Sequence, residues 1–212
     1  MPRALGQIDE IKSRAILRAA AELFMEKGAK VSMAEVARRA GVSRQTLYNR
    51  YPTKTDMARD LAALRSEEAV APLLADTGVE QALSAMAETL IRRIYVEGRG
   101  SALRGMALTS PETPELARVV YEAGAGQNMR RLADWLEEQD REGTLRVPDP
   151  VLAAEMFSGM ALGHGHLRSV LGLPQPEIDD IPARARDVAR RFMRAFTPDG
   201  DDGAIGPDAG SA

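Results

Sequence analysis

The chain has 212 residues, of which 44% are hydrophobic and 28% are charged, as in ordinary globular proteins of one or two domains. It contains no cysteine, which excludes disulfides, thiolate catalysis and cysteine-based redox sensing. No segment has the roughly 18 consecutive apolar residues of a membrane span, and the first residues lack the apolar core of a secretory signal. We therefore expect a cytoplasmic protein without a membrane partner.

The net charge of −3 is unevenly distributed along the chain. Residues 1–65 contain 13 lysines and arginines against 7 acidic residues, whereas residues 66–212 contain 15 against 24. A basic N-terminal part on an acidic body is typical of a protein whose first part faces phosphate groups and whose remainder is repelled by them.

The chain is predicted to begin with a flexible arm over residues 1–8, because termini without packing partners are usually disordered. A helix is predicted from residue 9 to Lys27, where apolar residues recur at helical spacing, and Gly28 suits its end. Its apolar stripe consists of Ile16, Ala19, Ala20, Leu23 and Phe24. We expect this stripe to cover the inner faces of the next two helices.

Residues 31–54 predict two short helices joined by a tight turn. Ser32 and Glu35 have the spacing of a capping box at the start of the first helix. Gly41 suits the left-handed residue that ends this helix, Ser43 can cap the second one, and Pro52 stops it. The predicted helix-turn-helix domain spans residues 9–52.

The second of these helices carries an unusual outward surface. Leu47 and Tyr51 are its predicted buried anchors, and its other side chains offer hydrogen bonds and positive charge without a carboxylate. Such a surface suits the major groove of DNA, where Arg, Gln and Asn pair with base edges and hydroxyl groups reach phosphates. The predicted base-reading residues are Arg44, Gln45, Asn49 and Arg50, and the predicted phosphate contacts are Ser32, Ser43, Thr46 and Tyr48. The alternative is a helical hairpin with an ordinary polar surface.

Residues 16–57 resemble the DNA-binding domain of the tetracycline-repressor (TetR) family of bacterial transcriptional regulators. The resemblance rests on Ile16-Leu17, Ala19-Ala20, Leu23-Phe24, Gly28, Ser32, Val36-Ala37, Ala40-Gly41-Val42-Ser43, Thr46-Leu47-Tyr48, Tyr51 and Lys54. It implies that Lys54 binds phosphate, as the lysine at this position does in the family. Gln45 stands where many members have glycine, and Arg50 where many have histidine or tyrosine. Both departures concern the operator sequence and not DNA binding itself.

The rest of the chain is predicted to be helical as well. A helix over residues 53–71 should connect the DNA-binding domain to a regulatory and dimerisation domain over residues 72–197, and residues 198–212 should form a disordered tail. Further helices are expected over residues 79–97, 101–108, 114–142, 150–171 and 182–196. The predicted fold class is therefore all-α. Residues 110–172 resemble the C-terminal regulatory domain of one TetR subgroup, which implies about nine helices, the last two pairing across a dimer axis.

Glycines in the segment 150–171 favour a homodimer independently of the resemblance. Gly159 and Gly163 stand one helical turn apart, and a glycine inside a helix costs about 1 kcal/mol. Their presence suggests that a neighbouring helix, of the same or of another subunit, approaches closely. The predicted interface consists of Gly159, Gly163, Leu167, Val170, Phe192 and Phe196, with Val151, Phe157, Met160 and Met193 adding apolar contact.

The resemblance also implies a small-molecule effector that binds between helices of the C-terminal domain. Aromatic and methionine side chains could line such a pocket, although each could equally belong to the core. The candidates are Tyr95, Met106, Tyr121, Met129, Trp135, Met156 and Phe157. The two histidines, His164 and His166, lie on different faces of their predicted helix and could not share a metal ion, so we expect no metal and no cofactor.

Neither a nucleotide-binding glycine loop nor a local Ser/His/acid motif points to catalysis, so we expect no enzyme. The prediction is a homodimeric, ligand-responsive transcriptional repressor. It would place residues 44–51 in the major groove of a near-palindromic DNA operator and leave when the effector binds. The alternative is a helical interaction protein whose helix-turn-helix binds a protein partner or only non-specific DNA.

Overall fold

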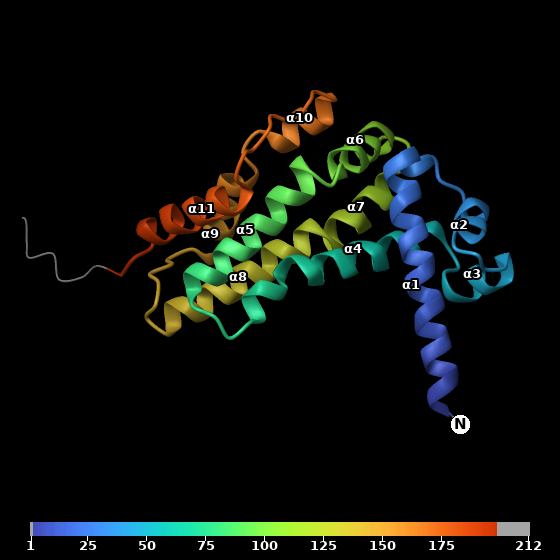
Figure 1. Cartoon of the computed structure of the whole chain (residues 1–212), viewed down its shortest axis with the longest axis horizontal. Helices are drawn as coiled ribbons and strands as arrows, with labels where there is room; N and C mark the ends of the chain where they lie inside the picture. Colours follow the sequence, from blue (N-terminus) through green and yellow to red (C-terminus); the bar gives the residue numbers. More distant parts are fainter. Residues whose placement is uncertain (1, 199–212) are drawn as a thin grey trace, which may run out of the picture.

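The computed structural model describes residues 2–198, and of residues 2–9, 29, 99, 101 and 109 only the backbone. Within this range the chain is all-α and contains no β-strand, which confirms the predicted fold class. Figure 1 shows a small N-terminal head at one end of a longer helical body. The tail prediction for residues 199–212 lies outside the described residues.

The head contains the first three helices. They are α1 (Pro2–Lys27), α2 (Met33–Arg39) and α3 (Arg44–Arg50), with the short 3-10 helix η1 (Gly28–Lys30) between the first two. Their apolar faces meet in one core that includes Ile16, Leu23, Val36 and Leu47, as the stripe on the first helix predicted. The prediction of a flexible arm over residues 1–8 was wrong for residues 2–8, which continue α1. Proline is well tolerated in the first turn of a helix, and a single glycine at position 6 costs too little to stop it.

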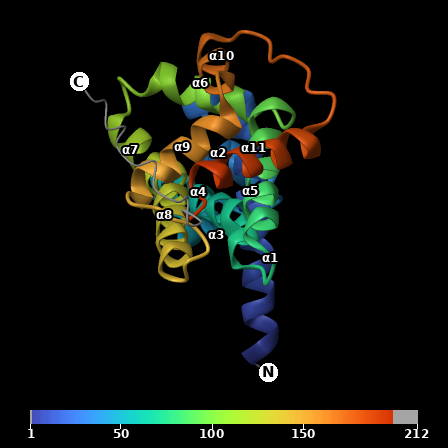
Figure 2. The same cartoon turned by 90° about the vertical axis from the view of Figure 1, so that its left-hand side faces the viewer.

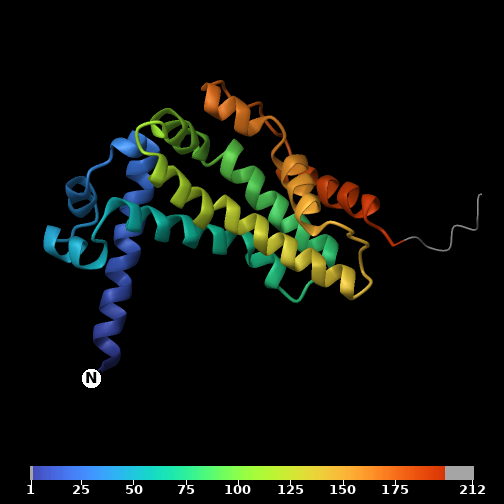
Figure 3. The same ribbon diagram turned by 180° about the vertical axis from the view of Figure 1, so that it is seen from behind.

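Helix α4 (Lys54–Val70) leaves the head and runs into the body (Figure 3). Its first half places Met57, Ala58 and Leu61 in the core of the head, whereas Val70 near its end belongs to the core of the body. The expected boundary between residues 52 and 53 therefore separates two helices but does not separate two cores.

The body consists of η2 (Ala71–Leu74) and the remaining helices. These are α5 (Val79–Tyr95), α6 (Arg99–Thr109), α7 (Pro114–Ala123), α8 (Ala125–Arg141), α9 (Pro150–Leu162), α10 (Gly165–Leu171) and α11 (Ile181–Ala195). Helix α11 packs along α5, and α8 packs against α9. Figure 2 looks along the molecule from the end opposite the head, where α9, α11 and the end of α8 face the viewer.

Two helices that the sequence predicted as continuous are each divided at a glycine. The expected helix 114–142 breaks at Gly124, where an added Cβ would lie 2.9 Å from the carbonyl oxygen of Val120. The expected helix 150–171 breaks at Gly163, whose φ of +50° and ψ of −135° are accessible essentially to glycine alone. Gly163 is thus explained by the backbone turn within one subunit, and not by a neighbouring helix.

An aromatic contact joins α9 and α11 within the core of the body. The rings of Phe157 and Phe192 meet edge to face with centroids 5.2 Å apart, and Phe192 also contacts Phe196. Phe157 and Phe192 are both completely buried within the subunit. Phe192 therefore cannot take part in the predicted subunit interface, and Phe157 is a core residue. Among residues 2–198, no helix is long and apolar enough to cross a membrane.

Candidate nucleic-acid interface

Side-chain caps fix the start of each helix in the helix-turn-helix. The Ser32 hydroxyl accepts a hydrogen bond from the Glu35 backbone N–H at 3.3 Å, and the Glu35 carboxylate accepts one from the Ser32 N–H at 3.0 Å. This capping box confirms the predicted start of α2. Ser43 caps α3 by accepting a hydrogen bond from the Thr46 N–H at 3.0 Å. Gly41 lies between the two helices with a φ of +66°, as the turn requires.

Two buried side chains hold α3 against the head. Leu47 is completely buried, and Tyr51, which directly follows the helix, is 2% exposed. Burial raises the pKa of the Tyr51 phenol, and the nearby Asp60 carboxylate adds to this effect. Both predicted anchors are therefore confirmed, and the orientation of α3 is fixed by packing on one side only.

The opposite side of α3 is exposed and carries the predicted base-reading residues. Arg44, Gln45, Asn49 and Arg50 are all exposed, and Tyr48 between them is 47% exposed. The Gln45 side chain donates a hydrogen bond to the Asn49 side chain at 2.7 Å. This bond holds the two amides next to each other on one face, where side chains of these types can pair with the edge of adenine.

The predicted phosphate contacts occupy different environments. Ser32 and Ser43 are exposed but use their hydroxyl oxygens as helix caps, and the Thr46 hydroxyl lies 2.8 Å from that of Ser43. Lys54 is half-buried, and its ammonium group donates to the carbonyl oxygen of Val31 at 3.4 Å. Lys54 in the first turn of α4 thereby lies beside the start of α2, on the same part of the head as the Ser32 cap.

Ion pairs tie α2 to the end of α1. Arg39 reaches back to Glu22 and Glu26, with nitrogen–oxygen distances of 3.2 and 2.9 Å. Lys27 pairs with Glu35, and this hydrogen bond, together with those from Ser32, lowers the pKa of Glu35 to about 2. Glu35 consequently serves both as the partner of the cap and as a link between two helices.

The comparisons with known proteins agree with this geometry. Residues 16–61 match the family described as "Bacterial regulatory proteins, tetR family", and residues 81–198, more than half of the chain, match the "AefR-like transcriptional repressor, C-terminal domain". The chain belongs to the TetR family. A helix-turn-helix-type transcriptional regulator of Mycobacterium tuberculosis (strain H37Rv) is 33% identical over 147 residues, which cover 66% of this chain and 73% of that protein.

Two solved structures extend the likeness to almost the whole chain. The flavonoid-responsive regulator FrrA is 31% identical, with a TM-score of 0.61 over 89% of this chain and 98% of that chain. A TetR-family transcriptional regulator from Mesorhizobium loti, 23% identical, shares the fold with a TM-score of 0.71 over 90% of this chain and 98% of that chain. This TetR-family protein is therefore a DNA-binding transcriptional regulator.

The residues predicted to line one effector pocket do not lie together. Met106 lines a cavity beside the head, and Tyr95 lines a second cavity near α10, where its hydroxyl donates to the Leu162 carbonyl at 2.8 Å. Met129 and Trp135 pack against the core of the body. Phe157 is fully buried, Tyr121 and Met156 are 62% and 45% exposed, and none of these three residues lines either of the two cavities.

Some of the predicted interface residues are exposed, whereas others are buried. Leu167 and Val170 on α10 are 54% and 37% exposed, and Gly159 on α9 has open space where a side chain would be. Phe196 is half-buried, and its side chain packs against the core of the body. Three further apolar residues on α9 and α10 are exposed but were not predicted to belong to an interface. They are Leu152, Leu171 and the pocket candidate Met156, and they lie near the predicted Val151 and Met160.

Proposed function

We propose that this chain is a homodimeric, small-molecule-responsive repressor that reads a near-palindromic operator with α3 in the major groove. The observation that carries the proposal is the exposed face of α3, which bears only hydrogen-bonding and cationic side chains while Leu47 and Tyr51 fix the helix from behind. Purely electrostatic attachment to DNA needs positive charge alone. The side-by-side amides of Gln45 and Asn49 serve to discriminate between bases.

The outward faces of α9 and α10 support the homodimer. Val151, Met156 and Leu167 are 63%, 45% and 54% exposed, and they lie on two consecutive helices with further exposed apolar residues. Soluble proteins rarely leave a large contiguous apolar surface in water unless it binds a partner. A second copy of the chain would cover this surface and present two heads to successive major grooves, about 34–36 Å apart. The name of the FrrA relative, a flavonoid-responsive regulator, supports the response to a small molecule.

The operator is best identified by selecting random duplex DNA with the purified full-length protein at near-physiological salt. We expect a near-palindromic sequence. Gln45→Ala should then lose about 1–3 kcal/mol of discrimination at one base pair of each half-site. Arg141→Ala is the matched control, because Arg141 is an exposed residue at the far end of α8, and this variant should select the wild-type sequence.

The alternative function, an interaction protein that binds a protein partner or only non-specific DNA, predicts a different result. The selection would recover no common sequence, and binding would disappear as the salt concentration rises. An equal loss of affinity of Gln45→Ala for every DNA sequence would likewise contradict base reading by α3.

A further inference from the structure

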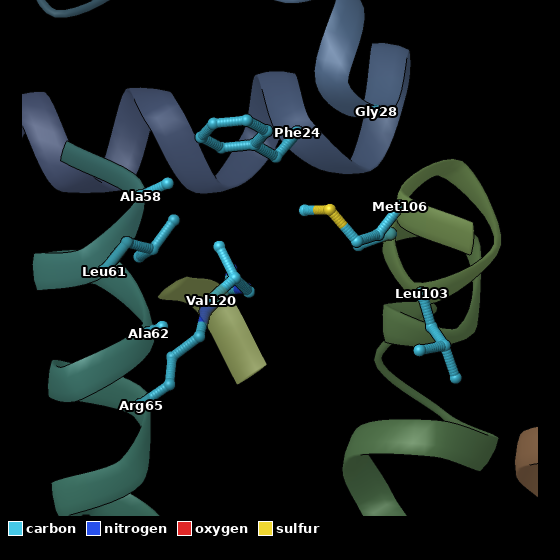
Figure 4. A pocket seen from close by; sticks show the side chains of 10 residues that line it. Phe24, Gly28, Ala58, Leu61, Ala62, Arg65, Leu103, Met106 and Val120 are labelled. Atoms are coloured by element: carbon cyan, nitrogen blue, oxygen red, sulfur yellow. The ribbon is translucent and has the colours of Figure 1, made fainter. Parts of the chain in front are cut away.

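A cavity of about 160 Å³ lies at the junction between the head and the body. Phe24 and Gly28 line it from the head, Leu61 and Arg65 from α4, and Met106 and Val120 from α6 and α7. Figure 4 shows Leu61, Met106 and Val120 pointing from three helices toward the space beneath Phe24. Of its lining residues, sequence reasoning named only Met106 as a pocket candidate, because the lining comes from four α-helices and η1 and most of its residues resemble ordinary core.

The two sides of this junction touch directly through backbone. An added Cβ at Gly105 on α6 would lie 2.9 Å from the Cα of Gly28, and one at Gly28 would lie 3.1 Å from the Cα of Gly105. No side chain separates the end of the head from α6 at this point. A molecule in the adjoining cavity would therefore contact both parts, and a change in the position of either part would change the shape of its site.

The lining defines the chemistry of an occupant. Nine of the ten lining residues are apolar or glycine, and Arg65 is the only charged one. Figure 4 shows its side chain extending from α4 toward Val120, so positive charge lies on one wall only. The volume is close to that of an engineered apolar cavity of about 150 Å³ that binds benzene, and below the roughly 300 Å³ at which pockets for larger ligands begin.

We propose that this cavity binds an uncharged, largely apolar molecule of about one aromatic ring, with an oxygen atom directed at Arg65, and that the occupant fixes the head on the body. This inference rests on the proposed ligand-responsive function and assigns its site to the head–body junction instead of the interior of the body. Because head and body share the walls, occupancy stabilises the arrangement in which the cavity has this shape.

The test compares two ligands of nearly equal shape on the full-length protein. Benzyl alcohol should bind, with nuclear Overhauser contacts from its ring protons to the methyl groups of Val120 and Met106. Benzylammonium should bind at least about tenfold more weakly, because its charge would be buried without a partner and close to a guanidinium. Contacts to Tyr95 or Trp135 instead, or equal affinity for the two compounds, would overturn the assignment.

A variant that fills the cavity tests the coupling to the head. Val120→Phe should abolish binding of benzyl alcohol and should shift operator affinity in the same direction as benzyl alcohol shifts that of the wild type. Val79→Phe is the matched control, because Val79 is also a half-buried valine but packs against the body core. It should leave both properties unchanged.

The outcomes separate this inference from the proposed function. If benzyl alcohol binds at Val120 and operator affinity does not change, the coupling is wrong although the cavity is a binding site. If the protein recognises no specific operator at all, the proposed repressor function fails. The contacts to Val120 and Met106 in the DNA-free protein then still show whether benzyl alcohol binds in this cavity. Because those contacts are measured on the wild type, poor folding of Val120→Phe would not remove the test.

Discussion

The contact between Gly28 and Gly105 makes a specific prediction for Gly105→Ala. The new Cβ would lie 2.9 Å from the Gly28 Cα, whereas ordinary contacts begin near 3.4 Å, so the two backbones must separate by about 0.5 Å. Gly28 has a φ of +58° at the junction of α1 and η1, where another local conformation would change the path of the chain between these two helices. We expect the substitution to displace the head relative to α6.

Two opposing effects determine the change in stability. Replacing glycine by alanine inside α6 favours the helix by about 1 kcal/mol, whereas overpacking a close contact costs about 1–3 kcal/mol. The net expectation is a destabilisation of up to about 2 kcal/mol, together with weaker operator binding. Thermal unfolding followed by circular dichroism measures the first effect, and titration of operator DNA measures the second.

Ala107→Gly provides the reference for helix propensity, because Ala107 is an exposed residue of the same helix. It should lower stability by about 1 kcal/mol and leave operator affinity unchanged. The reasoning is refuted if Gly105→Ala raises stability by as much as Ala107→Gly lowers it. That result would mean that the head and α6 do not constrain each other through this contact.

Three further predictions concern the DNA contact, the dimer and acid stability. Lys54→Ala should weaken binding to all DNA sequences alike and reduce the slope of log affinity against log salt by about one unit, and an unchanged slope would remove Lys54 from the phosphate contacts. Met156→Glu should give monomers in analytical ultracentrifugation, whereas Leu74→Glu, at an 82% exposed position on η2, should remain dimeric; a persisting Met156→Glu dimer would place the interface elsewhere. The pKa of Glu35 is depressed to about 2 from 4.5, so its contribution to stability is complete above about pH 4.5 and is lost as the pH falls toward 2. Glu35→Gln keeps the capping geometry without a titrating group, and its melting temperature should fall less steeply between pH 5 and pH 2.5; equal slopes would contradict the pKa shift.

The head could be predicted closely because its signals are local. The capping box of Ser32 and Glu35 and the cap at Ser43 act over three residues, so sequence spacing alone specifies them. The exposed face of α3 could be predicted from Leu47, because a buried anchor on one side of a helix determines which residues point outward. The roles of the exposed residues in contacting DNA stay predictions, since they depend on a partner.

The body was predicted less well because its features depend on tertiary packing. An amphipathic helix shows which residues are apolar but not whether they pack on their own subunit or on another one. Phe192 was therefore assigned to an interface although it is buried against Phe157, while Met156 was assigned to a pocket although it faces outward. The divisions at Gly124 and Gly163 depend on backbone angles that glycine permits but does not impose.

The sharing of α4 between two cores limits how the head can be exchanged with those of relatives. A chimera that takes residues 1–52 from a relative would pack a foreign head against Met57, Ala58 and Leu61. In this protein these three residues complete the apolar core of the native head. The smallest transplantable unit therefore includes the first two turns of α4 and ends after Leu61, where the match to the N-terminal family also ends. Such a unit also carries Phe24, Gly28, Ala58 and Leu61 of the cavity at the head–body junction, so an exchange of the head changes the operator and part of the cavity wall together.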